Sequence, residues 1–229
     1  MTNKSKSYLK YYTHLSMAFV SLLLTANILG PKPIKFGVAT VPAGLIIFPL
    51  TYLIGGVLTE VYGFAASRKV IWAGLFSNLF LSIACKIAIS MPYDPVWDGQ
   101  ESYASVLGVS RHLMLVSVFT YFIGEFVNSY IVAKLKVKMS GSKFWLRSIC
   151  GNWIGEFVET SLFLPLAFYH LPSDVLLNMA VFYYVFKFIY CTLSAPLVNK
   201  FSKFLKREED IDYYDYNTSF NPFLTLRGN

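Results

Sequence analysis

Four charged side chains lie near the middle of long apolar stretches, and they restrict the fold of this chain more than any other feature. They are Glu125, Glu156, Glu159 and Lys187. At the centre of a membrane helix each would cost about 2.5–3.5 kcal/mol, so four facing lipid would cost about 10–14 kcal/mol. That cost is comparable to the whole stability of a domain. We therefore expect these side chains to face one another, a ligand or an internal polar cavity, as in transporters.

The chain contains six apolar segments long enough to cross a bilayer. Its 229 residues are 55% hydrophobic and only 14% charged, with a mean hydropathy of +0.49. The first segment lacks a small-residue cleavage site, so we interpret it as a retained helix and not as a signal peptide. The predicted spans are residues 11–30, 41–61, 69–90, 112–134, 146–169 and 175–199. The sequence predicts an all-α polytopic membrane protein with a six-helix transmembrane domain over residues 1–207 and a cytoplasmic tail over 208–229.

Basic residues are concentrated at one end of these predicted spans. Of the 20 lysines and arginines, 15 lie in the N-terminal segment, the 2–3 loop, the 4–5 connection and the C-terminal segment, against three on the other side. Because positively charged loops stay in the cytoplasm, we expect both termini to be cytoplasmic. The net charge of +7 is then mostly a topology signal, and we expect no nucleic-acid partner. Lys32 and Lys35, on either side of Pro33, lie on the other side of the predicted membrane and are exceptions to this positive-inside rule.

Polar residues form two stripes on the predicted fourth and fifth spans. Their i, i+4, i+7 spacing places each set on a single helix face. The stripes are Tyr121, Glu125 and Asn128, and Asn152, Glu156 and Glu159. Lys187 on the sixth span is expected to pair with one of these carboxylates, or else to contact substrate or gate access.

The second predicted span is rich in glycine and proline. This composition favours a kinked or interrupted helix whose freed backbone groups line a cavity, although close helix packing alone is the alternative. Glu60 and Arg68 near its cytoplasmic end could pair as a gate or simply cap a helix end. The aromatic tail could be partly ordered, or it could dock onto the bundle.

Motifs for catalysis and for metal binding are missing from the sequence. The three cysteines have no C-x-x-C spacing, and the three histidines have no matching ligand at metal spacing. No H-E-x-x-H, G-x-S-x-G or Walker-type phosphate loop is present. We expect no enzymatic activity, no metal, no cofactor and no ATP hydrolysis by this chain.

Several segments resemble the hallmarks of the queuosine precursor transporter family, also called the vitamin uptake transporter family. They are FPLTYLIGGVLTEVYGFAASRKVIW (48–72), FWLRSICGNWIGEFVETSLF (144–163), the helix from Tyr184 to Pro196 with its central Lys187, and YDYNTSFNPF (214–223). The resemblance implies a six-helix carrier of the cell inner membrane that imports 7-deazaguanine bases.

The chain departs from the family pattern at positions on the polar stripes. The family usually has Asp at Gly56, Ser-Thr at Gly151-Asn152 and Asp at Glu159. A related purine-like base is therefore an alternative substrate.

A guanine-like ligand suits the polar residues named above. Its ring N–H and amino group can both donate to one carboxylate, which could be Glu159 or Glu156. Asparagine amides can bind a ring carbonyl, and aromatic faces can stack on the base. The candidate substrate-binding residues are Glu125, Asn128, Asn152, Glu156, Glu159, Lys187, Trp153, Tyr121 and Glu60.

The expected function is import of a small nucleobase across the lipid bilayer. A carboxylate that is protonated in one conformation and ionised in another could couple proton flow to transport, but passive transport is equally compatible with Gly56. Self-association into a homo-oligomer is a further expectation. Two alternatives are the substrate-binding membrane subunit of an energy-coupling vitamin importer and a non-transporting membrane scaffold.

Overall fold

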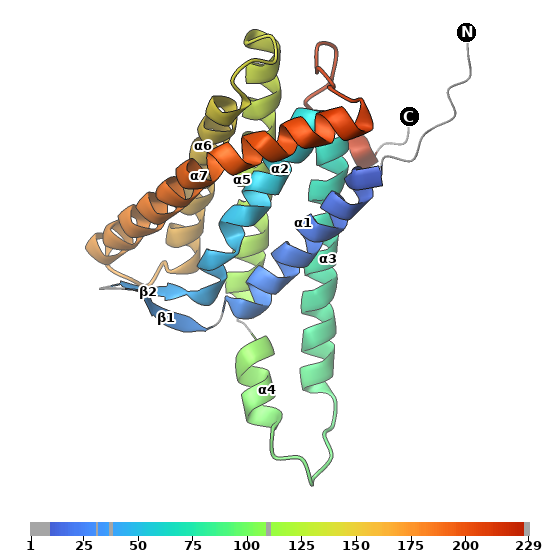
Figure 1. Ribbon diagram of the computed structural model, residues 1–229. Coiled ribbons are helices and arrows are strands. Elements are labelled where there is room, and N and C mark those ends of the chain that lie inside the picture. Colours follow the sequence, from blue (N-terminus) through green and yellow to red (C-terminus); the bar gives the residue numbers. More distant parts are fainter. Residues whose placement is uncertain (1–9, 31, 37–38, 109–110, 227–229) are drawn as a thin grey trace.

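Long helices make up most of the computed structural model, which describes residues 10–30, 32–36, 39–108 and 111–226 (Figure 1). The long helices are α1 (Lys10–Leu29), α2 (Phe48–Tyr62), α3 (Phe64–Ser90), α5 (Arg111–Lys138), α6 (Phe144–Ala167) and α7 (Ser173–Glu209). The shorter elements are α4 (Gln100–Leu107), the 3₁₀ turns Ala43–Ile46 and Pro222–Leu226, and strands β1 (Pro33–Phe36) and β2 (Ala39–Pro42). The two strands pair in an antiparallel hairpin.

Five segments of the described chain are long and apolar enough to cross a membrane. They are Lys10–Leu29, Ala43–Tyr62, Phe64–Ser90, Leu115–Lys138 and Ser173–Glu209. Helix α6 has 24 residues, but Arg147, Asn152 and two glutamates interrupt its apolar character. The chain is a polytopic, helical membrane protein, as the sequence predicts. The β1–β2 hairpin and α4 were not predicted.

Helices α2 and α3 meet at a single residue, without the loop that the sequence analysis expected. Gly63 has a φ of 84°, a conformation that glycine adopts without steric cost, and α3 begins at Phe64 instead of residue 69. The N–H group of Phe64 donates to both carboxylate oxygens of Asp215, at 3.0 and 3.2 Å. Because this cap comes from the distant tail, local sequence could not indicate it.

Helix α7 continues ten residues beyond the predicted end at residue 199 and crosses the bundle obliquely in Figure 1. At 1.5 Å per residue, its 37 residues span about 55 Å, which exceeds the roughly 30 Å hydrocarbon core. The helix is therefore longer than one perpendicular crossing requires, and its last turns are rich in lysine. The lysines there are good helix formers.

The tail after α7 docks onto the bundle, which is one of the two alternatives left open by the sequence. Arg68 on α3 donates to the carbonyl oxygens of Ser219 (3.0 Å) and Asn221 (2.8 Å). Trp72 donates to the Pro222 carbonyl at 2.8 Å. The tail thereby covers the first turns of α3.

Glycines bring α2, α5 and α6 close together. A Cβ atom added to Gly155 would lie 2.7 Å from the Gly124 carbonyl oxygen, which shows how closely the α5 and α6 backbones approach. A Cβ added to Gly55 would overlap the buried carboxylate of Glu125. The predicted interruption of the second span lies earlier, at the 3₁₀ turn Ala43–Ile46 that precedes α2. The adjacent glycines of α2 thus lie within regular helix.

Gly55→Ala should destabilise the protein by about 1–3 kcal/mol, because its methyl group displaces a fully buried carboxylate. Gly56→Ala is the matched control on the same helix, since its Cβ would lie 3.7 Å from Ser148 Oγ, an ordinary contact. Both variants gain the same helix propensity, so the difference between them isolates the contact with Glu125. Thermal unfolding in detergent measures this difference. Equal unfolding midpoints for the two variants would contradict the packing described above.

Candidate functional site

A buried ion pair joins α6 to α7 in the interior of the bundle. Lys187 Nζ lies 2.5 Å from Glu156 Oε2 and also forms a hydrogen-bonded ion pair with Glu159 Oε2. Thr160 Oγ1 lies 3.5 Å from the same nitrogen. All these side chains are buried. The predicted pairing of Lys187 with a buried glutamate is present, and the helical spacing of α6 places both carboxylates on the face toward α7.

A second polar group lies between α2 and α5. Asn128 donates to the backbone carbonyl of Tyr52 at 3.2 Å and to Glu125 Oε1 at 3.4 Å. Glu125 and Asn128 have no exposed surface. Within the described residues, Glu125 Oε2, Asn128 Oδ1 and both amide atoms of Asn152 have no hydrogen-bond partner. Buried polar atoms normally have partners, so these atoms are available for further hydrogen bonds.

The two groups together hold more negative than positive charge. Glu125, Glu156 and Glu159 are three buried carboxyl groups, and in the described interior only Lys187 pairs with any of them. An uncompensated buried charge costs several kcal/mol. A bound proton, or hydrogen-bond donors of a ligand, would balance this arrangement.

A cavity of about 160 Å³ adjoins the ion pair on the side of the β1–β2 hairpin and α4. Glu159, Thr160 and Lys187 form part of its wall, while most of the remaining wall is apolar. An apolar cavity of about 150 Å³ holds benzene. The space next to the ion pair therefore suits a small ring system.

Two residues that line this cavity escaped the sequence analysis. Asn78 on α3 is only 4% exposed, and Tyr183 on α7 is buried one turn before Lys187. An asparagine inside an apolar helix was the available signal for Asn78. Tyr183 carried no signal that set it apart from the many other aromatic residues of the chain.

The predicted site residues divide into those at the cavity and those behind it. Glu159 and Lys187 line the cavity. Glu156 does not line it but forms an ion pair with Lys187. The remaining candidates do not line it; these are Glu125, Asn128, Asn152, Tyr121, Trp153 and Glu60.

The two aromatic candidates have aromatic neighbours of their own. The ring of Trp153 stacks on Phe188 with centroids 3.7 Å apart. Tyr121 packs edge-on against Tyr52 with centroids 5.5 Å apart. Their stacking on a base stays a prediction.

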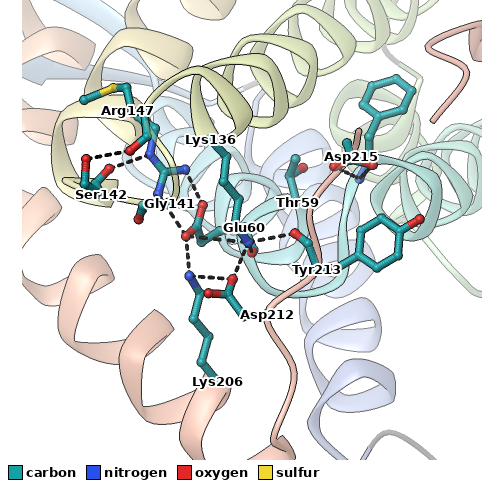
Figure 2. A network of polar contacts seen from close by, with 12 residues as sticks. Thr59, Glu60, Lys136, Gly141, Ser142, Arg147, Lys206, Asp212, Tyr213 and Asp215 are labelled. Atoms are coloured by element: carbon teal, nitrogen blue, oxygen red, sulfur yellow. Dashed lines mark hydrogen bonds and ion pairs between the residues drawn. The ribbon is translucent and has the colours of Figure 1, made fainter. Parts of the chain in front are cut away.

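Glu60 lies near the C-terminal end of α2, at the end of that helix farther from the cavity. It belongs to an ionic network with three cations, Arg147, Lys136 and Lys206 (Figure 2). Arg147 donates to both carboxylate oxygens, at 3.0 Å for Nη2 to Oε1, and Lys206 Nζ lies 2.5 Å from Oε1. The proposed pair of Glu60 with Arg68 is wrong, because the Arg68 side chain is bound to the tail.

Asp212 of the tail extends this network to both lysines. Its carboxylate contacts Lys136 Nζ and lies 2.9 Å from Lys206 Nζ. Burial acts to raise the pKa of Asp212, but hydrogen bonds from the two lysines outweigh it and keep the pKa below its usual value. The contact is therefore fully present at neutral pH and is lost as pH falls through that lowered pKa. The network ties α2, α5, α6, α7 and the tail together at this end.

Comparison with known proteins gives two matches. The model of a family described as "Putative vitamin uptake transporter" matches residues 42–200, more than two thirds of the chain. A Bacillus subtilis (strain 168) protein named "Probable queuosine precursor transporter" is 22% identical over 186 residues, which cover 80% of this chain and 81% of that protein. No solved structure matches significantly.

The matched region begins at Pro42, before α2, includes the polar stripes and Lys187, and ends at Lys200 within α7. It thus contains every predicted site residue. The chain belongs to the vitamin uptake transporter family and is a membrane transporter.

Proposed function

We propose that this protein is an inner-membrane carrier that imports 7-deazaguanine bases, or a related purine-like base. The observation that carries the proposal is the buried Glu159–Lys187 pair on the wall of a ring-sized cavity. The name of the Bacillus subtilis relative supports the substrate class.

The ion pair complements the edge of a guanine-like base. That edge offers an amino group and a ring N–H as donors, followed by a ring carbonyl as acceptor. Glu159 can accept from both donors while the Lys187 ammonium donates to the carbonyl. Glu156 keeps Lys187 neutralised when Glu159 turns to the base. Asn78 can read the remaining polar edge from the facing helix.

In this proposal helix α6 also crosses the membrane, as the fifth of six spans, and both termini are cytoplasmic. Its Arg147, Asn152 and Glu156 side chains are all buried, so they face protein and not lipid. The start of α1, the α5–α6 turn and the end of α7 lie at one end of the bundle (Figure 1), which carries most of the basic residues. Positively charged segments favour the cytoplasmic side.

In this orientation the cavity lies toward the outer side and the Glu60 network closes the cytoplasmic side. Release of a base into the cytoplasm requires this network to separate. Glu125, Asn128 and Asn152 lie between the cavity and the Glu60 network. Their unpartnered polar atoms can bind the base after it leaves the cavity. The aromatic rings of Tyr121 and Trp153 become available only when their present ring contacts change.

Glu159→Gln should reduce uptake of a labelled 7-deazaguanine base at least about 25-fold. Loss of one partner of a buried, hydrogen-bonded charge pair costs about 2–5 kcal/mol. Glu159→Asp keeps the charge and should retain more uptake than Glu159→Gln. Uptake is measured in cells that lack their own carriers for these bases.

Glu101→Gln, in exposed α4, is the control for removal of a carboxylate. Amounts of folded protein in the membrane are compared for all variants. Full uptake by Glu159→Gln would contradict the proposed site. Uptake that requires a copurifying ATPase would instead favour the energy-coupling importer.

Uptake should increase as the external medium becomes more acidic and should stop when an uncoupler is added. The three buried carboxyl groups exceed the single lysine, so a proton entering from outside can accompany the base and be released inside. The measurement is the initial rate of uptake across mildly acidic to mildly alkaline medium. Rates that ignore both pH and uncoupler would show passive transport.

A further inference from the structure

A second pocket, of about 480 Å³, lies between the start of α6 and the last turns of α7. Its polar lining consists of three lysines, one carboxylate and three uncharged side chains; these are Lys143, Lys203, Lys206, Glu60, Ser142, Asn199 and Ser202. It lies at the end assigned to the cytoplasm, and its lining residues Glu60, Ser142 and Lys206 belong to the network drawn in Figure 2.

Positive charge exceeds negative charge in and behind this pocket. Arg147 and Lys136 add two cations to the three lysines, whereas the network contains two carboxylates, Glu60 and Asp212. Lys206 is engaged with both carboxylates. Lys143 and Lys203 are exposed, and neither forms an ion pair within the described part of the chain. Two uncompensated ammonium groups thus face the same pocket.

The start of α6 adds to this positive potential. Lys143 precedes the helix with a φ of 50°, and no side chain caps the first turn. The first N–H groups of a helix have no partner within it and carry the positive end of the helix dipole. The N–H groups of Leu146 and Arg147 already donate to the Lys143 carbonyl. The two N–H groups before them, together with the two lysines, match a phosphate group.

The surroundings of the pocket favour a lipid over a soluble anion. Trp145 lines the pocket and is 44% exposed, and tryptophan is enriched where membrane meets water. Leu197, less than two turns before Lys203, is 70% exposed, as expected for a side chain that faces lipid tails. Basic pockets between membrane helices on the cytoplasmic side bind anionic headgroups.

We propose that this pocket binds the phosphate headgroup of an anionic phospholipid, held by Lys143, Lys203 and the first turn of α6. Because the headgroup would bridge α6 and α7 beside the Glu60 network, its binding would stabilise the closed cytoplasmic end. Neither the identity of the transported base nor its coupling enters this proposal.

The test uses native mass spectrometry of the full-length protein in detergent with added phosphatidylglycerol or phosphatidylcholine. The wild-type protein should prefer phosphatidylglycerol. A Lys143→Ala, Lys203→Ala variant should bind it about 25-fold more weakly, which corresponds to about 1 kcal/mol for each lysine. The matched control is Lys138→Ala, Lys200→Ala, which removes two exposed lysines outside the pocket and should bind like the wild type.

Unfolding midpoints without added lipid establish that all variants are folded. Equal loss of binding in both double variants would overturn the proposal, because it would indicate a diffuse positive surface. Unchanged binding in the Lys143, Lys203 variant would overturn it as well. In a further arm, inorganic phosphate at matched ionic strength should not displace phosphatidylglycerol. Displacement at low phosphate concentration would assign the pocket to a soluble anion and overturn the lipid assignment.

Discussion

The buried ion pair of Lys187 with Glu156 and Glu159 is the interaction on which the rest of this structure depends. Removing three charges from water is expensive, and well-packed apolar residues of similar volume often stabilise a protein equally well or better. Helix packing alone therefore does not account for these residues. Glu159 and Lys187 lie on a cavity wall, and the proposed function accounts for them, because desolvated charges would bind a polar ring far more selectively than apolar residues can.

Close backbone packing makes room for this polar interior. Glycines let α5 and α6 approach until Gly155 meets the carbonyl of Gly124, and Gly55 leaves space for the Glu125 carboxylate. At the end of the bundle farther from the cavity, long cationic side chains converge on Glu60 and hold the helices and the tail together. The result is a bundle with a cavity on one side of the ion pair and a closed ionic network on the other.

The energetic argument predicted the pairing of Lys187, because charge burial leaves few alternatives. Helical periodicity predicted the α6 stripe of Asn152, Glu156 and Glu159, whose side chains are all buried. Hydropathy predicted the bundle, although the polar residues of α6 lower its apolar character.

Contacts between distant residues were not predictable from local sequence. Glu60 binds Arg147, which is 87 residues away, and Asp215 caps α3 from 151 residues away. Helical position also did not reveal that Trp153 stacks on Phe188. Which side chains meet across a bundle depends on helix rotation and crossing angle, and these follow from the packing of all the helices together.

Direct ligand binding to the purified protein tests the central claim that the Glu159–Lys187 pair recognises a guanine-like edge. In thermal unfolding, 7-deazaguanine should stabilise the wild-type protein, and adenine, which lacks the adjacent ring N–H and amino donors, should stabilise it far less. Glu159→Gln should abolish the difference between the two bases. Equal stabilisation by both bases, or an unchanged preference in Glu159→Gln, would contradict the assignment of this site.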